Sequence, residues 1–179
     1  MTRQYGTAVG ALTGWRHCPR CATELRLEPN CAVCPACGYV QYAASVPAVS
    51  AFAHDDDGRI LLARRAVEPD AGKWDSPGGF LEEGEDPVAG LLRELREETS
   101  LECEVGDFVG AFVDTYGADE DARSVLNLAW EVRVVSGEPI PADDVAELRW
   151  FPRDALPQDA ELAFRWLAVS LRDWAAKGR

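Results

Sequence analysis

The sequence predicts one α/β domain that follows a small cysteine-rich module. Two observations support this organisation. Short apolar runs with strand character alternate with helical patterns from Ser45 onward, and five of the six cysteines crowd into the segment before it. We therefore expect a loose arm over residues 1–14, a cysteine module over residues 15–44 and the α/β domain over residues 45–179.

The expected elements of the α/β domain follow in order along the chain. Residues 46–54 and 59–66 are apolar runs separated by the turn sequence Asp55-Asp56-Asp57-Gly58, which predicts a hairpin of two strands. A helix should begin at Pro87, with Asp86 as its N-cap. The remaining expected elements are strands over 107–116, 124–135 and 146–152 and a helix over 160–176.

Acidic residues dominate the chain, with 31 Asp and Glu against 18 Lys and Arg and a formal net charge of -13. A field of this sign repels polyanions, so non-specific nucleic-acid binding is not expected. No apolar run approaches the roughly 18 residues of a membrane span, and the N-terminus lacks the features of a secretory signal. We therefore expect a cytoplasmic protein with no membrane partner. An acidic protein can still act on phosphate compounds when bound cations invert the local charge.

The cysteine module contains two matched C-P-x-C turns separated by 12 residues. Their thiolates offer four soft ligands in a tetrahedron, which is the geometry of structural zinc. The expected Zn²⁺ ligands are Cys18, Cys21, Cys34 and Cys37. Metal binding, worth on the order of 10 kcal/mol in small zinc peptides, would stabilise a module with too few apolar residues to fold alone.

Cys31 leaves an alternative open, because it also forms a C-x-x-C motif with Cys34. Pro35 and Gly38 favour the pair of Cys34 with Cys37, since they repeat the chemistry of the first turn. A redox pair, a disulfide and a set of buried thiols are the competing interpretations. A structural or dimer-forming role for the module is favoured over contact with nucleic acid.

The predicted helix carries three glutamates on neighbouring turns, directly after a glycine-rich loop. At about 100° per residue, the helix should turn one stripe toward the core and place the glutamates on a different face. The stripe is Val88, Leu91, Leu92 and Leu95, and the glutamates are Glu94, Glu97 and Glu98. Arg93 lies four residues before Glu97, so a salt bridge can hold that carboxylate.

A solvated acidic face is the simplest interpretation of these glutamates. Like charges about 4 Å apart, however, repel by about 4 kcal/mol at an effective dielectric near 20, so a partly enclosed cluster needs a cation. Carboxylate oxygens suit Mg²⁺ or Mn²⁺, which keep open positions for water and phosphate. The loop Pro77-Gly78-Gly79 could add a backbone carbonyl ligand.

The spacing of these residues resembles the signature of the Nudix hydrolases. The match runs over 23 residues from Gly79 to Leu101, and Ser100 stands where the family has glycine. The resemblance implies an α/β/α sandwich on a mixed sheet and metal-dependent hydrolysis of a nucleoside diphosphate linked to another moiety. The principal Mg²⁺ or Mn²⁺ ligands that it implies are Glu97 and Glu98, with the Gly79 carbonyl as an added ligand and Glu94 as a further ligand or the base. The further catalytic residues that it implies are Glu85 and Arg93, as the pair that steadies the loop against the helix.

A later loop could supply an extra catalytic acid, as in some members of the family. The candidates are Asp143, Asp144 and Glu147, and a cap with solvated acids is the alternative. Arg64 and Arg65 are neighbours on a predicted strand, so at most one of them faces the site.

The substrate stays open at this level. A zinc ribbon before such a domain resembles NADH pyrophosphatases, some of which remove NAD-type caps from RNA, but their run SQPWPFP is absent. The proline typical of many ADP-ribose pyrophosphatases is absent too. The candidate substrates are NADH, ADP-ribose, FAD and dinucleoside polyphosphates. Nucleic acid is not expected as a partner, except for capped RNA ends. A homodimer is expected from the family resemblance alone. The alternative is a catalytically weak nucleotide-binding or regulatory protein whose zinc ribbon contacts nucleic acid.

Overall fold

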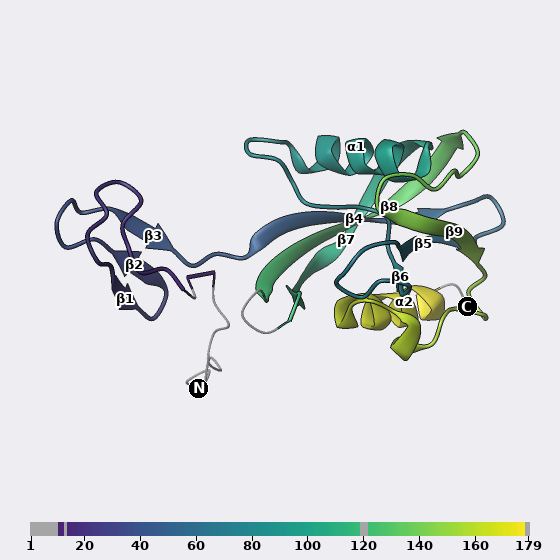
Figure 1. Cartoon of the computed structure of the whole chain (residues 1–179). Helices are drawn as coiled ribbons and strands as arrows, with labels where there is room; N and C mark the ends of the chain where they lie inside the picture. The colour runs from purple at the N-terminus through teal and green to yellow at the C-terminus, as the bar shows by residue number, and fades with distance from the viewer. Residues whose placement is uncertain (1–10, 13, 119–121, 178–179) are drawn as a thin grey trace. The chain divides into compact units, whose positions relative to one another are not determined.

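The computed structural model describes residues 11–177 except residues 13 and 119–121 (Figure 1). Most of the predicted N-terminal arm therefore lies outside the described residues. The chain divides into two compact units. The cysteine unit lies within residues 1–46 and 115–124, and the sheet unit lies within residues 47–114 and 125–179.

The cysteine unit contains a three-stranded antiparallel sheet in the order β1-β2-β3. Its strands are β1 (Arg26–Glu28), β2 (Cys31–Val33) and β3 (Val40–Tyr42). The two C-P-x-C turns have the same backbone pattern, because Ala22 N–H donates to the Cys18 carbonyl at 2.9 Å and Gly38 N–H donates to the Cys34 carbonyl at 3.1 Å. Both donors have left-handed backbone conformations, with φ of 59° and 73°.

The sheet unit is built on a six-stranded sheet in the order β6-β5-β4-β8-β7, with β9 also paired to β5. Helices α1 and α2 cover opposite faces of this sheet, as Figure 1 shows. This arrangement confirms the predicted α/β/α sandwich. The elements are β4 (Val46–His54), β5 (Ile60–Arg65), β6 (Trp74–Asp75), α1 (Pro87–Thr99), β7 (Glu102–Tyr116), β8 (Arg123–Ser136), β9 (Val145–Phe151) and α2 (Arg165–Lys177).

Each face of the sheet has its own hydrophobic core. Phe52 of β4 and Leu62 of β5 pack with Leu167 on the α2 face. Ala51 and Leu61 pack with α1 on the other face. Side chains alternate between the two faces of a strand, and both faces of β4 and β5 are covered. These strands are therefore apolar at consecutive positions rather than at every second one.

Most predicted elements agree with the structure to within two residues, and three differences have physical reasons. Strand β7 begins at Glu102, five residues earlier than predicted, because the exposed Gly106 and Asp107 interrupt the alternation that starts at Glu102 in this edge strand. Helix α2 begins at Arg165, after a 3-10 turn at Asp159–Glu161. The two-residue strand β6 is too short to be recognised from a pattern. Within the described residues, neither helix is long and apolar enough to cross a membrane.

Helix α1 begins and ends as its sequence dictates. The Asp86 side chain accepts hydrogen bonds from Val88 N–H at 3.0 Å and Ala89 N–H at 3.1 Å. At the other end Ser100 adopts a left-handed conformation with φ of 60°, and its N–H donates to the Arg96 carbonyl. A serine therefore takes the position at which glycine is the usual residue.

The core-facing stripe of α1 differs from the prediction. Val88 is 37% exposed, whereas Glu98 is 6% exposed and lies on the buried stripe with Leu91 and Leu95. Glu98 follows Leu91 by seven residues, a rotation of about 700°, which brings it to within about 20° of the same direction. The prediction that all three glutamates share a face away from the core was therefore wrong for Glu98.

Candidate active site and zinc centre

The glycine-rich loop lies against strand β4. The Pro77 carbonyl accepts a hydrogen bond from Ala51 N–H at 2.8 Å, and the Gly79 carbonyl accepts one from Val49 N–H at 2.9 Å. Gly78 has φ of 143°, and a Cβ at this position would lie 2.1 Å from the Val49 carbonyl oxygen. Only glycine fits such a close approach of two backbones.

Glu98 reaches from the buried side of α1 to this loop. Its Oε2 accepts a hydrogen bond from Gly78 N–H at 2.8 Å. Burial raises the pKa of Glu98 well above its ordinary value, and the carboxylates of Asp144, Glu94 and Asp75 raise it further, against the Gly78 hydrogen bond. These neighbours favour the neutral acid, and a bound cation would favour the carboxylate.

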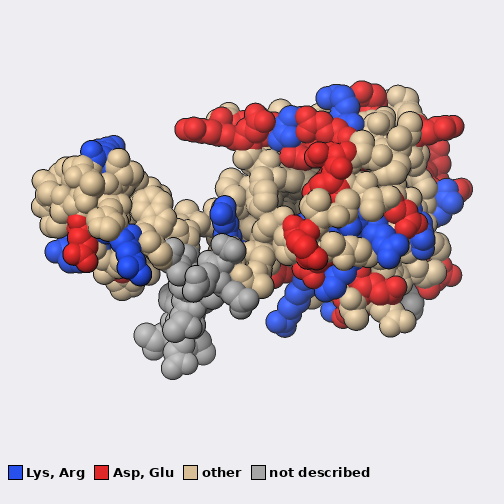
Figure 2. Space-filling view, in the orientation of Figure 1, with Lys and Arg blue, Asp and Glu red and all other residues tan. Residues whose placement is uncertain are grey.

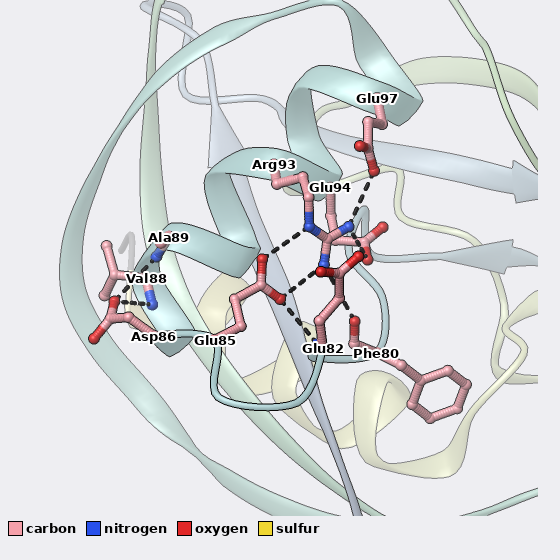
Figure 3. A network of polar contacts seen from close by, with 9 residues as sticks. All are labelled: Phe80, Glu82, Glu85, Asp86, Val88, Ala89, Arg93, Glu94 and Glu97. Carbon is pink, nitrogen blue, oxygen red and sulfur yellow. Dashed lines mark hydrogen bonds and ion pairs between the residues drawn. The ribbon is translucent and has the colours of Figure 1, made fainter.

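Arg93 collects three carboxylates around one guanidinium group (Figure 3). Its Nε and Nη2 donate to the two oxygens of Glu85 at 2.8 and 2.9 Å. Its Nη1 donates to Glu94 at 2.8 Å and to Glu97 at 3.0 Å. The hydrogen bonds from Arg93 lower the pKa of Glu85 to about 2, so this acid is ionised at any ordinary pH. The Glu85–Arg93 pair thus joins the loop before α1 to the helix.

Glu94 lies directly over Gly79. A Cβ built on Gly79 would fall 2.6 Å from the Cδ and both carboxylate oxygens of Glu94. Burial raises the pKa of Glu94, and the hydrogen bond from Arg93 lowers it. The absence of a side chain at residue 79 therefore makes room for the Glu94 carboxylate beside the Gly79 backbone.

The predicted donors are three α1 carboxylates and a loop carbonyl, which are oxygen ligands of the kind that Mg²⁺ and Mn²⁺ prefer. Acidic side chains gather over α1 and the loop that leads into it, as Figure 2 shows. Two of the three carboxylates have raised pKa values, which a bound cation would lower.

The three candidates for the extra acid lie at different places. Asp144 raises the pKa of Glu98, and Asp143 raises that of Glu94, so both lie on the α1 side of the sheet. The loop that carries them is tied to the end of α1 through Ala142 N–H, which donates to the Glu98 carbonyl at 3.1 Å. Glu147 instead pairs with Arg64 at 3.5 Å.

Sequence reasoning missed a buried ion pair beside the site. Arg65 Nη1 lies 3.3 Å from Asp75 Oδ2, and the two side chains are only 12% and 16% exposed. Burial raises the pKa of Asp75 to about 6, against the lowering effect of Arg65. The alternation of strand β5 indicated that at most one of Arg64 and Arg65 would face the site, and nothing in the pattern pointed to Asp75.

The cysteine unit brings four thiols together. Sγ atoms of Cys18, Cys21, Cys34 and Cys37 all lie within 4.8 Å of one another. The Cys18–Cys37 and Cys21–Cys34 sulfur pairs are 3.6 and 3.5 Å apart. A tetrahedral zinc with Zn–S bonds of about 2.3 Å would place its sulfurs about 3.8 Å apart, so the cluster fits this ion. Cys31 lies outside the cluster, and its sulfur contacts Glu28 at 3.8 Å.

A family model described as the NUDIX domain matches residues 44–170. The chain therefore belongs to the NUDIX family. The NAD-capped RNA hydrolase NudC of Pseudomonas aeruginosa is 31% identical over 147 residues, which cover 79% of this chain and 49% of the relative. The ADP-ribose pyrophosphatase of Methanocaldococcus jannaschii is 33% identical over 105 residues, which cover 58% of this chain and 60% of the relative.

The match therefore spans less than two thirds of either relative. Among solved structures, a NUDIX hydrolase from Nitrosomonas europaea superimposes with a TM-score of 0.73 over 90% of this chain and 91% of its own, at 24% identity. At that identity the likeness concerns the fold, and it agrees with the sandwich described above.

Proposed function

We propose that the protein is a metal-dependent pyrophosphohydrolase that cleaves a nucleoside diphosphate linked to another moiety, with NAD-type and ADP-ribose-type compounds as the leading substrates. The observation that carries the proposal is the buried Glu98, which lies beside Gly78 with the carboxylates of Glu94 and Asp144 nearby. A buried acidic cluster of this kind is costly unless it binds a cation.

Each residue has a separate task in this proposal. Glu94, Glu97 and Glu98, with the Gly79 carbonyl, would hold Mg²⁺ or Mn²⁺, which would neutralise pyrophosphate oxygens and lower the pKa of a bound water. Asp144 is the extra acid and accepts a proton from the attacking water. The Arg93–Glu85 pair fixes the loop against α1 and keeps the carboxylates in register.

We also propose that Cys18, Cys21, Cys34 and Cys37 bind one structural Zn²⁺. The four sulfurs leave no open position on a tetrahedral ion, which is typical of structural rather than catalytic zinc. The Cys21 thiol has its pKa lowered to about 6, first by hydrogen bonds with Thr23 and then by the bond with Cys34. The pKa of the Cys37 thiol is raised to about 12. A backbone hydrogen bond from Tyr39 lowers this pKa, but the hydrogen bond with Cys34 and burial raise it by more.

The test is a substrate panel with purified full-length protein and Mg²⁺ or Mn²⁺. The panel contains NADH, ADP-ribose, FAD, a diadenosine polyphosphate and RNA with an NAD-type cap, and products are separated by chromatography. We expect release of a nucleoside monophosphate from at least one compound, with loss of turnover in the Glu98→Gln variant and in excess chelator. Binding of these nucleotides without turnover by the parent protein would support a regulatory role instead, and turnover in chelator would refute the proposed chemistry.

A further inference from the structure

We propose that Asp75 is a positioning residue that holds the Arg65 guanidinium away from Glu98 and Asp144, so that these two carboxylates stay available to a divalent cation. This inference rests on the proposed function, since it concerns the same metal site. It assigns a role to the buried ion pair that neither the α1 glutamates nor the glycine-rich loop explains.

The register of the strands directs Arg65 toward the site. Ala63 of β5 lies opposite Asp75 of β6, so Asp75 shares the face of Leu61 and Ala63, and Arg65 reaches this face through its ion pair with Asp75. Leu61 packs with α1 on this face. Arg64 points to the other face, where it pairs with Glu147.

Several contacts fix the Arg65 side chain. Its Nε donates to the Pro69 carbonyl at 2.8 Å, its Nη1 donates to Asp75 at 3.3 Å, and its guanidinium lies 5.5 Å from the centre of the Phe164 ring. With both members of the pair less than one-fifth exposed, solvent screens the interaction only weakly. These contacts therefore hold the Arg65 guanidinium beside Asp75.

Asp144 is held next to this pair through its backbone. The β5–β9 pairing shifts register between Arg64 and Arg65, so that Arg65 lies opposite Val145. One residue further along, Ala66 N–H donates to the Asp144 carbonyl at 2.7 Å. The Asp144 carboxylate acts on both Asp75 and Glu98, as the pKa shifts of those two acids show. The Asp75, Asp144 and Glu98 carboxylates thus lie on one side of the sheet, and Asp75 is the one that the Arg65 guanidinium contacts.

The consequence follows from the chemistry of arginine. A guanidinium is permanently charged and carries five donors, so it takes another carboxylate partner if Asp75 becomes neutral. Among the described residues, the carboxylates that are coupled to Asp75 are Asp144 and Glu98, and a guanidinium bound to either would compete with a divalent cation for the same oxygens. Loss of an outer-shell partner of a metal ligand commonly weakens metal binding about 10–100-fold.

A double-mutant cycle tests the inference, with Mn²⁺ binding to the full chain measured by electron paramagnetic resonance in the absence of substrate. We expect Asp75→Asn to weaken Mn²⁺ binding about 10–100-fold. The double variant Asp75→Asn/Arg65→Gln should return to within about 3-fold of wild type, because no guanidinium is left to compete. Arg64→Gln is the matched control and should bind as wild type does, since that side chain lies on the opposite face.

A merely structural role for the pair gives a different pattern, in which both single variants weaken binding and the double variant is no better than Asp75→Asn. That pattern overturns the inference, as does unchanged binding in Asp75→Asn. If Asp75→Asn does not fold, Arg65→Gln decides alone: its Mn²⁺ affinity should be kept or increased, and a loss of about tenfold or more refutes the idea. Wild-type protein that binds no Mn²⁺ would overturn the proposed function together with this inference.

Discussion

The close fit of Glu94 over Gly79 allows the most direct test of the site. In Gly79→Ala the new Cβ would lie 2.6 Å from the Glu94 carboxylate, whereas ordinary contact begins at 3.4 Å, so the carboxylate must move by about 0.8 Å. The end of a glutamate side chain can make this movement without disturbing the backbone. A displacement of about 1 Å at a reacting centre can cost about 100-fold in rate, which is about 2.7 kcal/mol.

We therefore expect Gly79→Ala to lower kcat/KM about 100-fold while its free energy of unfolding stays within about 1 kcal/mol of wild type. The assay is steady-state hydrolysis of the best substrate of the panel, with thermal unfolding as the measure of stability. Gly84→Ala is the control, because a Cβ there has nothing within 4 Å and its φ of 80° affects stability alone. A Gly79→Ala protein with kcat/KM within about 3-fold of wild type would refute the proposed place of Glu94 in the site.

Three further predictions concern Glu98, Arg93 and the zinc centre. Glu98→Gln should lower kcat/KM on the order of 1000-fold, about 4 kcal/mol. In chelator, the difference in Tm between this variant and wild type should shift in favour of the variant as the pH rises above 4.5. The pKa of Glu98 is raised in the folded state, so ionisation of Glu98 destabilises the folded wild-type protein, and the variant has no such group. A Tm difference that does not change with pH would contradict this. Arg93→Lys should lower kcat/KM about 10–100-fold at saturating Mg²⁺, since an ammonium cannot bridge both Glu85 oxygens and Glu94, and unchanged kinetics would argue against the bridging role. Cys18→Ser should abolish stoichiometric zinc in elemental analysis, whereas Cys31→Ser should keep one zinc per chain; zinc loss in both variants would contradict the ligand assignment.

Local patterns were sufficient for the parts of the fold that depend on neighbours in sequence. The Asp86 cap, the Pro87 start of α1 and the apolar runs of β4 and β5 are all set by propensity and periodicity. The predicted β7 was too short because the exposed Gly106 and Asp107 interrupt the polar–apolar alternation that starts at Glu102.

The site was only partly predictable, for a different reason. The spacing of the signature predicted Glu94, Glu97 and Glu98 as ligands, and the seven-residue step from Leu91 to Glu98 could have indicated that Glu98 lies on the buried stripe. The Arg65–Asp75 pair joins residues from two strands through the β5–β6 register. Such tertiary contacts have no sequence period, so a single sequence cannot reveal them.

The two cysteine turns differ in one respect that bears on how the proposed zinc centre would assemble. Gly38 adopts its left-handed conformation at almost no cost, whereas Ala22 in the matching position has a Cβ and pays about 1 kcal/mol for the same geometry. Before metal arrives, the second turn is therefore the better pre-formed of the two. In the proposed zinc centre, closure of the Ala22 turn should therefore be the step that costs more backbone strain.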